Sequence, residues 1–124
     1  MGIFIFQKAE RLSRKKSIQE LFDKGSSFYL YPFKVLHASN PDSSATVNQI
    51  LISVSARNFK KAVDRNLIKR RVREAYRLQK EIIQNKPQKG VFAFIYTAKS
   101  VMPYSDIKSK LFLVLKKIEK LEVL

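Results

Sequence analysis

The sequence contains no cysteine and a single histidine, His37, among its 124 residues. Without thiols the chain has no disulfide framework, no cysteine nucleophile and no cysteine zinc site. His37 follows Val35 and Leu36 in an apolar stretch, and imidazole catalysis requires an orienting partner that a lone histidine does not provide. We therefore interpret His37 as a strand residue without a chemical role.

Long apolar runs are also missing. The segments MGIFIF at the N-terminus and LFLVL at 111–115 are far shorter than a membrane span. Glycine and proline are few, at 3 and 4 residues, and hydrophobic residues make up 45%, which excludes a disordered basic tail. The sequence thus predicts one soluble, cytoplasmic domain over residues 1–124, with the order of residues 1–10 left open.

Acidic side chains are scarce relative to basic ones. The chain has 10 Asp and Glu against 25 Lys and Arg, which gives a formal net charge of +15. Such self-repulsion on a folded body is typical of a protein that binds a polyanion, with nucleic acid as the first candidate and an anionic membrane as the second. The acidic residues are scattered, so they do not predict the clustered carboxylates of a metal-dependent protein nuclease.

Hydrophobic periodicity predicts an α+β fold in the order αβββαβα, with helices packed on a small four-stranded mixed sheet. Pro32 marks a strand break, Ser13 or Ser17 and Asn58 are candidate helix caps, and Gly25 is a candidate left-handed residue after the first helix. The strand–helix–strand order in the second half predicts two parallel strands. The expected helices are 13–23, 58–84 and a terminal helix from Ser105, and the expected strands are 27–31, 33–38, 46–55 and 91–98.

The segment 57–77 holds nine basic residues against two acidic ones. On a helix, one stripe faces the core and the opposite arc carries charge. The core stripe is Ile68, Val72, Ala75, Tyr76, Gln79, Ile82 and Ile83, and the opposite arc is Asn66, Lys69, Arg70, Arg73 and Arg77. A solvated face is the alternative, but such faces usually mix signs. Arginine suits bidentate phosphate contacts, and folded RNA fits better than a DNA groove because no helix-turn-helix pattern precedes the segment.

Three stretches carry a resemblance to a known family. They are RLSRKKSIQELFDKG at 11–25, ISVSARNFKKAVDRNLIKRRVREAYRL at 52–78 and VFAFIYTAKS at 91–100. In this order they resemble the protein subunit of bacterial ribonuclease P. The resemblance implies a fold like the second domain of ribosomal protein S5, with a left-handed βαβ crossover. It also implies that a partner RNA carries catalysis with Mg²⁺, while the protein binds that RNA and the 5′ leader of precursor tRNA.

The family's Arg-Asn-Arg helix motif maps onto Arg65, Asn66 and Leu67, so the third arginine is replaced by leucine. Helical placement puts Leu67 at the margin of the core stripe, where we expect it to pack sideways. The family's paired lysines after the strand correspond to Ala56 and Arg57. The resemblance and the charge pattern together give the expected RNA-binding residues Arg57, Lys60, Lys61, Arg65, Asn66, Lys69, Arg70, Arg73 and Arg77.

The resemblance also implies a leader cleft between the first helix and the sheet, lined by aromatic side chains that stack on bases. Phe22 matches one aromatic position, whereas Ile18 and Leu36 replace aromatics, and Tyr29 and Tyr31 are further candidates. The alternative is that Phe22 and Phe33 belong to the core. The expected cleft residues are Arg14, Lys15, Ile18, Phe22, Phe33 and Leu36.

Two functions from different classes follow. The leading prediction is an accessory subunit of a ribonucleoprotein endonuclease, with ribonuclease P RNA and precursor tRNA as partners and no membrane or small-molecule cofactor. In this prediction the protein subunit supplies neither a catalytic residue nor a metal site. The alternative is a ribosomal-type RNA-binding protein without catalysis. Composition does not separate the two, but the 52–78 resemblance favours the first.

Overall fold

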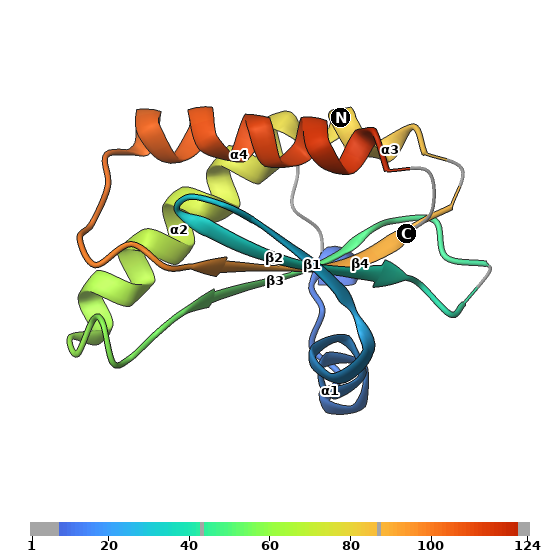
Figure 1. Ribbon diagram of the computed structural model, residues 1–124, viewed down its shortest axis with the longest axis horizontal. Coiled ribbons are helices and arrows are strands. Elements are labelled where there is room, and N and C mark those ends of the chain that lie inside the picture. The colour runs from blue at the N-terminus through green and yellow to red at the C-terminus, as the bar shows by residue number, and fades with distance from the viewer. Residues whose placement is uncertain (1–7, 43, 87, 122–124) are drawn as a thin grey trace.

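The computed structural model describes residues 8–42, 44–86 and 88–121. Its elements follow the predicted αβββαβα order, with a short N-terminal 3-10 helix and an extra helical turn after the long helix (Figure 1). They are η2 (Lys8–Glu10), α1 (Lys15–Lys24), β1 (Ser26–Leu30), β2 (Phe33–Ser39), β3 (Gln49–Val54), α2 (Ala62–Gln79), α3 (Glu81–Gln84), β4 (Gly90–Tyr96) and α4 (Tyr104–Glu119).

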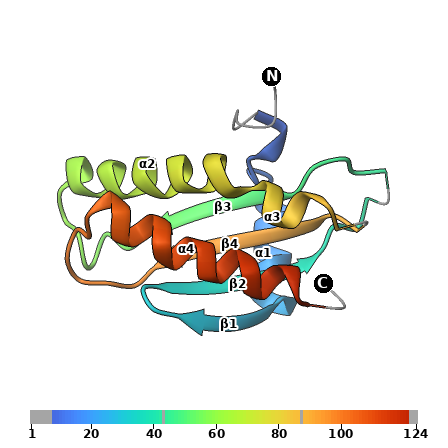
Figure 2. The same cartoon turned by 90° about the horizontal axis from the view of Figure 1, so that it is seen from above.

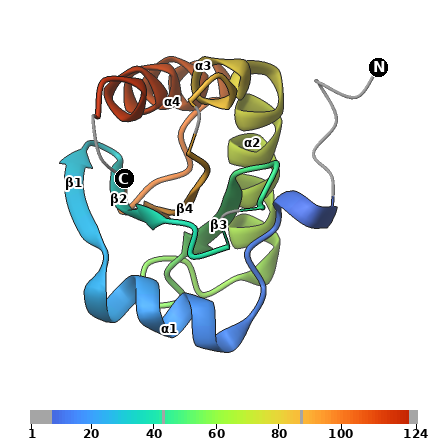
Figure 3. The ribbon, with the colours of Figure 1, turned by 90° about the vertical axis from the view of Figure 1, so that its right-hand side faces the viewer.

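The four strands form one mixed sheet in the order β1-β2-β4-β3. β1 pairs with β2 and β2 with β4 in antiparallel fashion, whereas β3 and β4 are parallel, as predicted from the strand–helix–strand order. Helices α2 and α4 cover one face of the sheet and α1 crosses the other (Figure 3). The central strand β4 therefore has both faces covered, which explains its nearly continuous apolar sequence.

The crossover from β3 through α2 to β4 is left-handed. In Figure 2, where the helix layer faces the viewer, β3 and β4 both run from right to left and β4 lies on the lower side of β3. Rotated so that the strands point upward, β4 stands to the left of β3 with the helix in front. Most parallel crossovers have the opposite hand. The hand that the resemblance implied is thus present in this chain.

The larger core lies between the sheet and the α2–α4 layer. Aromatic rings dominate it: Phe33 meets Phe94 and Tyr96 edge-on, with ring centroids 6.4 and 6.1 Å apart, and Tyr76 of α2 lies 6.0 Å from Phe94. Such rings bury large apolar areas, and edge-to-face pairs add about 0.5 to 1.5 kcal/mol each. This core fixes the side of α2 that faces inward.

A smaller core lies under α1 on the opposite face of the sheet. Leu21 of α1 is 1% exposed and packs with Leu36, Val91 and Ala93 of the sheet and with Leu12. The chain leaves α1 through Gly25, where an added Cβ would lie 2.5 Å from the Leu21 carbonyl oxygen. Close approach of helix and sheet therefore requires glycine here.

Several predicted boundaries were wrong in detail. Gly25 is extended, with φ −69° and ψ 154°, and is not a left-handed cap. Helix α1 begins after Arg14 without a side-chain cap, so neither Ser13 nor Ser17 has that role. The long helix begins at Ala62 instead of Asn58, because residues 55–61 form turns in which the Phe59 amide donates to the Ser55 carbonyl at 3.1 Å.

The N-terminal segment is attached to the end of α2 by a buried ion pair. Lys80 Nζ donates to Glu10 Oε1 at 2.8 Å, and both side chains are 2% exposed. The segment also joins the sheet, since the Leu12 amide donates to the Ile50 carbonyl at 2.9 Å. Two charges removed from water are tolerated only when they are paired. Residues 8–12 are therefore an integral part of the fold, while residues 1–7 lie outside the described residues.

Candidate nucleic-acid interface

Helix α2 separates its apolar and charged residues as the sequence predicted. Ile68, Val72, Ala75 and Tyr76 are fully buried at 0% exposure. On the outer side, Asn66 and Arg70 are exposed and Lys69 and Arg73 are half-buried. In the helix layer, α2 lies on the side of β3, and α4 lies next to it on the side of β4 and β2 (Figure 2). Because the stripe with Ile68 and Val72 faces the core, the opposite stripe with Asn66 and Arg70 faces solvent.

A shallow pocket opens on the outer side of α2. It is lined by Val63, Asn66, Leu67, Lys69, Arg70 and Arg73. Four of these were predicted RNA-binding residues, and the pocket brings them together. Leu67 is half-buried within the pocket lining, so it belongs to the charged surface and not only to the margin of the core. Val63 was not singled out from sequence, although its i, i+4 spacing to Leu67 is the signal that places both on one stripe.

Two arginines of the basic run donate to backbone carbonyls inside the protein. Arg65 Nη1 lies 2.6 Å from the Phe59 carbonyl oxygen and 3.0 Å from that of Lys60. Arg71 Nη1 lies 2.7 Å from the Met102 carbonyl oxygen. A guanidinium has five donors, so further contacts remain available. Both arginines nevertheless have a structural task that their sequence positions did not reveal.

The loop before α2 extends the positive surface. Arg57, Lys60 and Lys61 are all exposed there. At the other end of the helix, Arg77 forms a two-point ion pair with Glu74, at 3.0 Å from Nε and 2.5 Å from Nη2. Hydrogen bonding to Arg77 lowers the pKa of the Glu74 carboxyl, and the same bond raises the pKa of Arg77. The positive surface thus runs from the loop along α2, and at its far end the charge of Arg77 is offset by Glu74.

The predicted leader residues occupy different surroundings. Lys15 and Phe22 are exposed on α1, and Ile18 packs at the edge of the smaller core. Leu36 is 7% exposed beneath α1, whereas Phe33 is fully buried on the opposite face of the sheet. Phe33 was therefore wrongly predicted to line a cleft beside α1, because strand alternation turns it toward α2 and α4.

Tyr29 is an exposed aromatic on the α1 face of the sheet. It is 58% exposed, and its hydroxyl lies 3.1 Å from Thr97 Oγ1. Its cross-strand partner is Lys34, which pairs with Ile95 of the smaller core, so all three point to the α1 side. The sequence raised Tyr29 only as a further candidate, since alternation alone does not say which face of a strand α1 covers.

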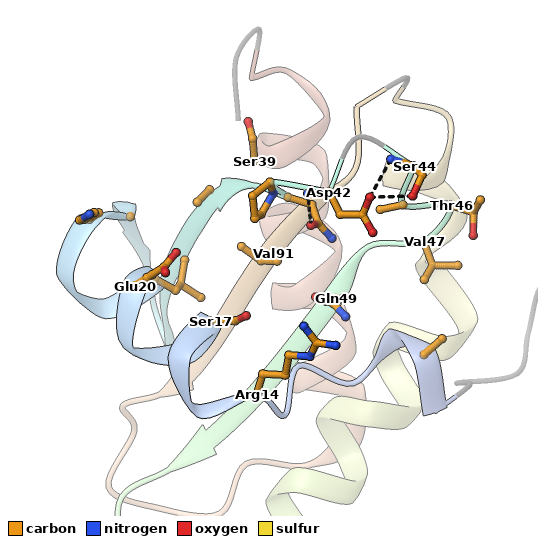
Figure 4. Close-up of a pocket in the computed structure, with 18 residues that line it drawn as sticks. Arg14, Ser17, Glu20, Ser39, Asp42, Ser44, Thr46, Val47, Gln49 and Val91 are labelled. Atoms are coloured by element: carbon orange, nitrogen blue, oxygen red, sulfur yellow. Dashed lines mark hydrogen bonds between the residues drawn. The ribbon is translucent and has the colours of Figure 1, made fainter.

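Arg14 lies on the other side of α1, in a pocket of about 480 Å³. Figure 4 shows it beside Ser17 and Gln49, with Asp42 across the pocket bonded to Ser44. These hydrogen bonds lower the pKa of Asp42. The lining holds two cations, Arg14 and Lys24, and two carboxylates, Glu20 and Asp42, so its formal charge is zero. This pocket does not extend the positive surface, and Arg14 does not share a flank of α1 with Phe22.

Neither metal binding nor membrane insertion is supported within the described residues. No three His, Asp or Glu side chains there are grouped as metal ligands. No helix in residues 8–42, 44–86 and 88–121 is long and apolar enough to cross a bilayer. The polar side chains that the outer face of α2 presents are cationic and amide groups, which can bind anions.

Comparisons with known proteins agree with each other. The family model of ribonuclease P matches residues 6–119. The ribonuclease P protein component of Porphyromonas gingivalis is 36% identical over 103 residues, covering 83% of this chain and 73% of the relative. The ribonuclease P protein component of Petrotoga mobilis is 33% identical over 119 residues, covering 92% of this chain and 95% of the relative.

Solved structures show the same likeness. The Staphylococcus aureus RNase P protein has a TM-score of 0.74 and 30% identity, with 91% of this chain and 97% of the other covered. The RNase P protein from Thermotoga maritima has a TM-score of 0.72 and 27% identity, with 87% and 96% covered. The α+β architecture is thus shared along nearly the whole chain.

Proposed function

This chain belongs to the ribonuclease P protein family, and from that premise we propose which of its surfaces meet RNA in the 5′ maturation of precursor tRNA. Membership separates this role from that of a ribosomal protein with similar charge. The partner is ribonuclease P RNA, and precursor tRNA is the proposed substrate. We propose that the protein acts in the cytoplasm, as the sequence predicted.

The outer face of α2 is the proposed contact with ribonuclease P RNA. The observation that carries this proposal is the gathering of Asn66, Lys69, Arg70 and Arg73 around one exposed pocket, on a helix whose opposite stripe is fully buried. Arg57, Lys60 and Lys61 continue the surface at the start of the helix. Each cation that contacts a phosphate releases condensed counterions, so binding should weaken steeply with salt.

The flank of α1 that carries Lys15, Ile18 and Phe22 is the proposed contact with the 5′ leader. Phe22 is 48% exposed and Tyr29 is 58% exposed on the same side of the sheet, so both rings are available to stack on unpaired bases. Arg14 and Phe33 are left out of this surface because the first lines another pocket and the second is core.

The protein's proposed part in the reaction is electrostatic and positional. It brings substrate and RNA together and screens the repulsion between their phosphates, and no side chain acts as nucleophile or general base. The Mg²⁺ that the resemblance implies fits the RNA better than this chain, because the described carboxylates are not grouped as a metal site.

Reconstitution tests this function. The full chain is mixed with the ribonuclease P RNA of Porphyromonas gingivalis and a precursor tRNA, at a Mg²⁺ concentration too low for the RNA alone to cleave. Cleavage at the mature 5′ end is expected only when both components are present. Cleavage by the protein without RNA would overturn the assignment of catalysis to the RNA, and failure to stimulate the RNA would overturn the subunit role.

A further inference from the structure

The charged face of α2 contains an apolar step formed by Val63 and Leu67. Val63 is 75% exposed and Leu67 is half-buried, and both line the same pocket as Asn66, Arg70 and Arg73. The two side chains are four residues apart, so they lie one above the other on the helix. The cationic surface of α2 therefore includes an apolar patch.

This apolar patch is too small for a protein partner. Two aliphatic side chains on one helix fall far short of the roughly 800 Å² per partner that a stable protein interface buries. Their cationic and amide rim would also remain unpaired against an apolar protein surface. The occupant must therefore be small, with a flat apolar face for Val63 and Leu67 and negative charge next to that face for the surrounding cations.

A regular RNA duplex does not match the step either. The outside of an A-form helix offers phosphates and 2′-hydroxyls, while its bases are stacked inside. Packed against Val63 and Leu67, that polar backbone would lose water without gaining a partner. An unpaired nucleotide differs, because its base presents a flat, weakly polar face while its own phosphates stay within reach of neighbouring cations.

We propose that the Val63–Leu67 step seats the base of one unpaired nucleotide of the bound RNA, with Arg70 and Arg73 on its flanking phosphates. This inference rests on the proposed contact between α2 and RNA and adds what kind of nucleotide that contact selects. Arg70 and Arg73 follow Leu67 by about 4.5 and 9 Å along the helix axis, so they reach phosphates beyond the base. Asn66 places an amide donor and acceptor beside it.

Salt dependence separates an apolar seat from a phosphate contact. Val63→Ala and Leu67→Ala should each weaken binding of the full chain to ribonuclease P RNA about three- to tenfold, with the slope of log Kd against log salt unchanged, because apolar contact releases no counterions. Leu78→Ala is the matched control, since Leu78 is an exposed leucine of the same helix outside the pocket, and it should bind as the parent does. Val63 is so exposed that its truncation leaves the fold intact.

The seated nucleotide is identified by replacing Leu67 with the photoreactive amino acid benzoylphenylalanine and mapping the crosslink on the RNA. The crosslink should fall on one unpaired nucleotide. Removing the base of that nucleotide should weaken binding to the parent protein about as much as Val63→Ala combined with Leu67→Ala does, and should weaken binding to that combined variant no further. A crosslink spread along a duplex, or additive losses, would overturn the inference.

Failure of the wider proposal has a different signature. If Arg70→Ala with Arg73→Ala leaves RNA affinity and its salt slope unchanged, α2 is not the RNA contact and both proposals fall. If that double variant flattens the slope while Val63→Ala and Leu67→Ala bind as the parent does, only the apolar seat is wrong.

Discussion

At the scale of single residues, Arg65 belongs to the expected RNA-binding motif and also stabilises the loop before α2. Its guanidinium joins the first turn of α2 to the carbonyls of Phe59 and Lys60. The loop so held carries Arg57, Lys60 and Lys61, three exposed cations. Arg65 is therefore a positioning residue for its neighbours, whatever further contact its remaining donors make.

Arg65→Ala should loosen that loop in the protein without RNA. Hydrogen bonds from a charged donor contribute about 1.5 to 3 kcal/mol, so amide exchange at residues 57–61 should accelerate about ten- to 150-fold. Lys69→Ala removes a charge from the same helix without touching the loop and serves as control. Equal exchange rates in the parent and Arg65→Ala would refute the positioning role.

His37 gives the stability of the protein a pH dependence. Its ring lies 5.8 Å from Phe28, and its Nδ1 is buried without a hydrogen-bond partner among the described residues. Burial lowers the pKa of His37 below its ordinary value of 6.5. The unfolded chain therefore binds the proton more tightly, so stability is complete above about pH 6.5 and declines as pH falls through the lowered pKa.

We expect a lower urea midpoint at pH 5.5 than at pH 7.5 for the parent. His37→Phe should remove most of this difference, because His37 is the chain's only histidine and carboxyls titrate mainly below this window. Urea unfolding followed by circular dichroism measures both midpoints. A His37→Phe protein that still shows the full pH difference would assign the effect to another group.

At the scale of elements, α2 has one face in the core and an opposite face that we propose binds phosphate. Arg70→Ala with Arg73→Ala should weaken RNA binding and reduce the salt slope by about 1.5, since each lost phosphate contact removes roughly 0.7 to 0.9. The fold should persist because neither residue is fully buried. Lys117→Ala with Lys120→Ala removes the same charge from α4 and should leave the slope nearly unchanged, which titrations at several salt concentrations would verify.

The elements that the sequence predicted well are those with strong periodicity. The apolar stripe of α2 was correctly identified at Ile68, Val72, Ala75 and Tyr76, because 3.6-residue spacing fixes the buried side of a helix. The start of α2 was predicted wrongly, at Asn58 instead of Ala62. Asn58 has the chemistry of a cap, but Phe59 is buried in the core, and the turns that place it there end only at Lys61.

Site residues outside such periodicity were harder to predict. Phe33 alternates correctly within β2, but alternation defines two faces without saying which of them α1 covers. Arg14 precedes the first helical residue, so helical spacing does not fix its side. The carbonyl of Met102 that receives Arg71 lies 31 residues away, and no local pattern indicates such a contact.

At the scale of the whole molecule, the Glu10–Lys80 pair ties residues 70 positions apart. Lys80→Met should lower the free energy of unfolding by about 3 to 5 kcal/mol, because it leaves the Glu10 carboxylate buried without its cation. Glu10→Leu combined with Lys80→Met should cost less than Lys80→Met alone, since no charge then stays buried. Urea unfolding of the parent, Lys80→Met, Glu10→Leu and the double variant measures these differences, and a loss in the double variant equal to the sum of the two single losses would contradict the pairing.

The position of β4 governs the order in which the chain can be completed during synthesis. β4 lies between β2 and β3, although it is made after both, and the sheet has no direct β2–β3 pairing in its strand order. A ribosome-bound chain that has released only residues up to α3 therefore lacks the strand that joins its two halves. Its basic α2 is already outside the ribosome at that stage. This protein can acquire its proposed RNA-binding surface in full only after residue 96 has emerged, so a truncated product would carry the charge without the fold that orients it.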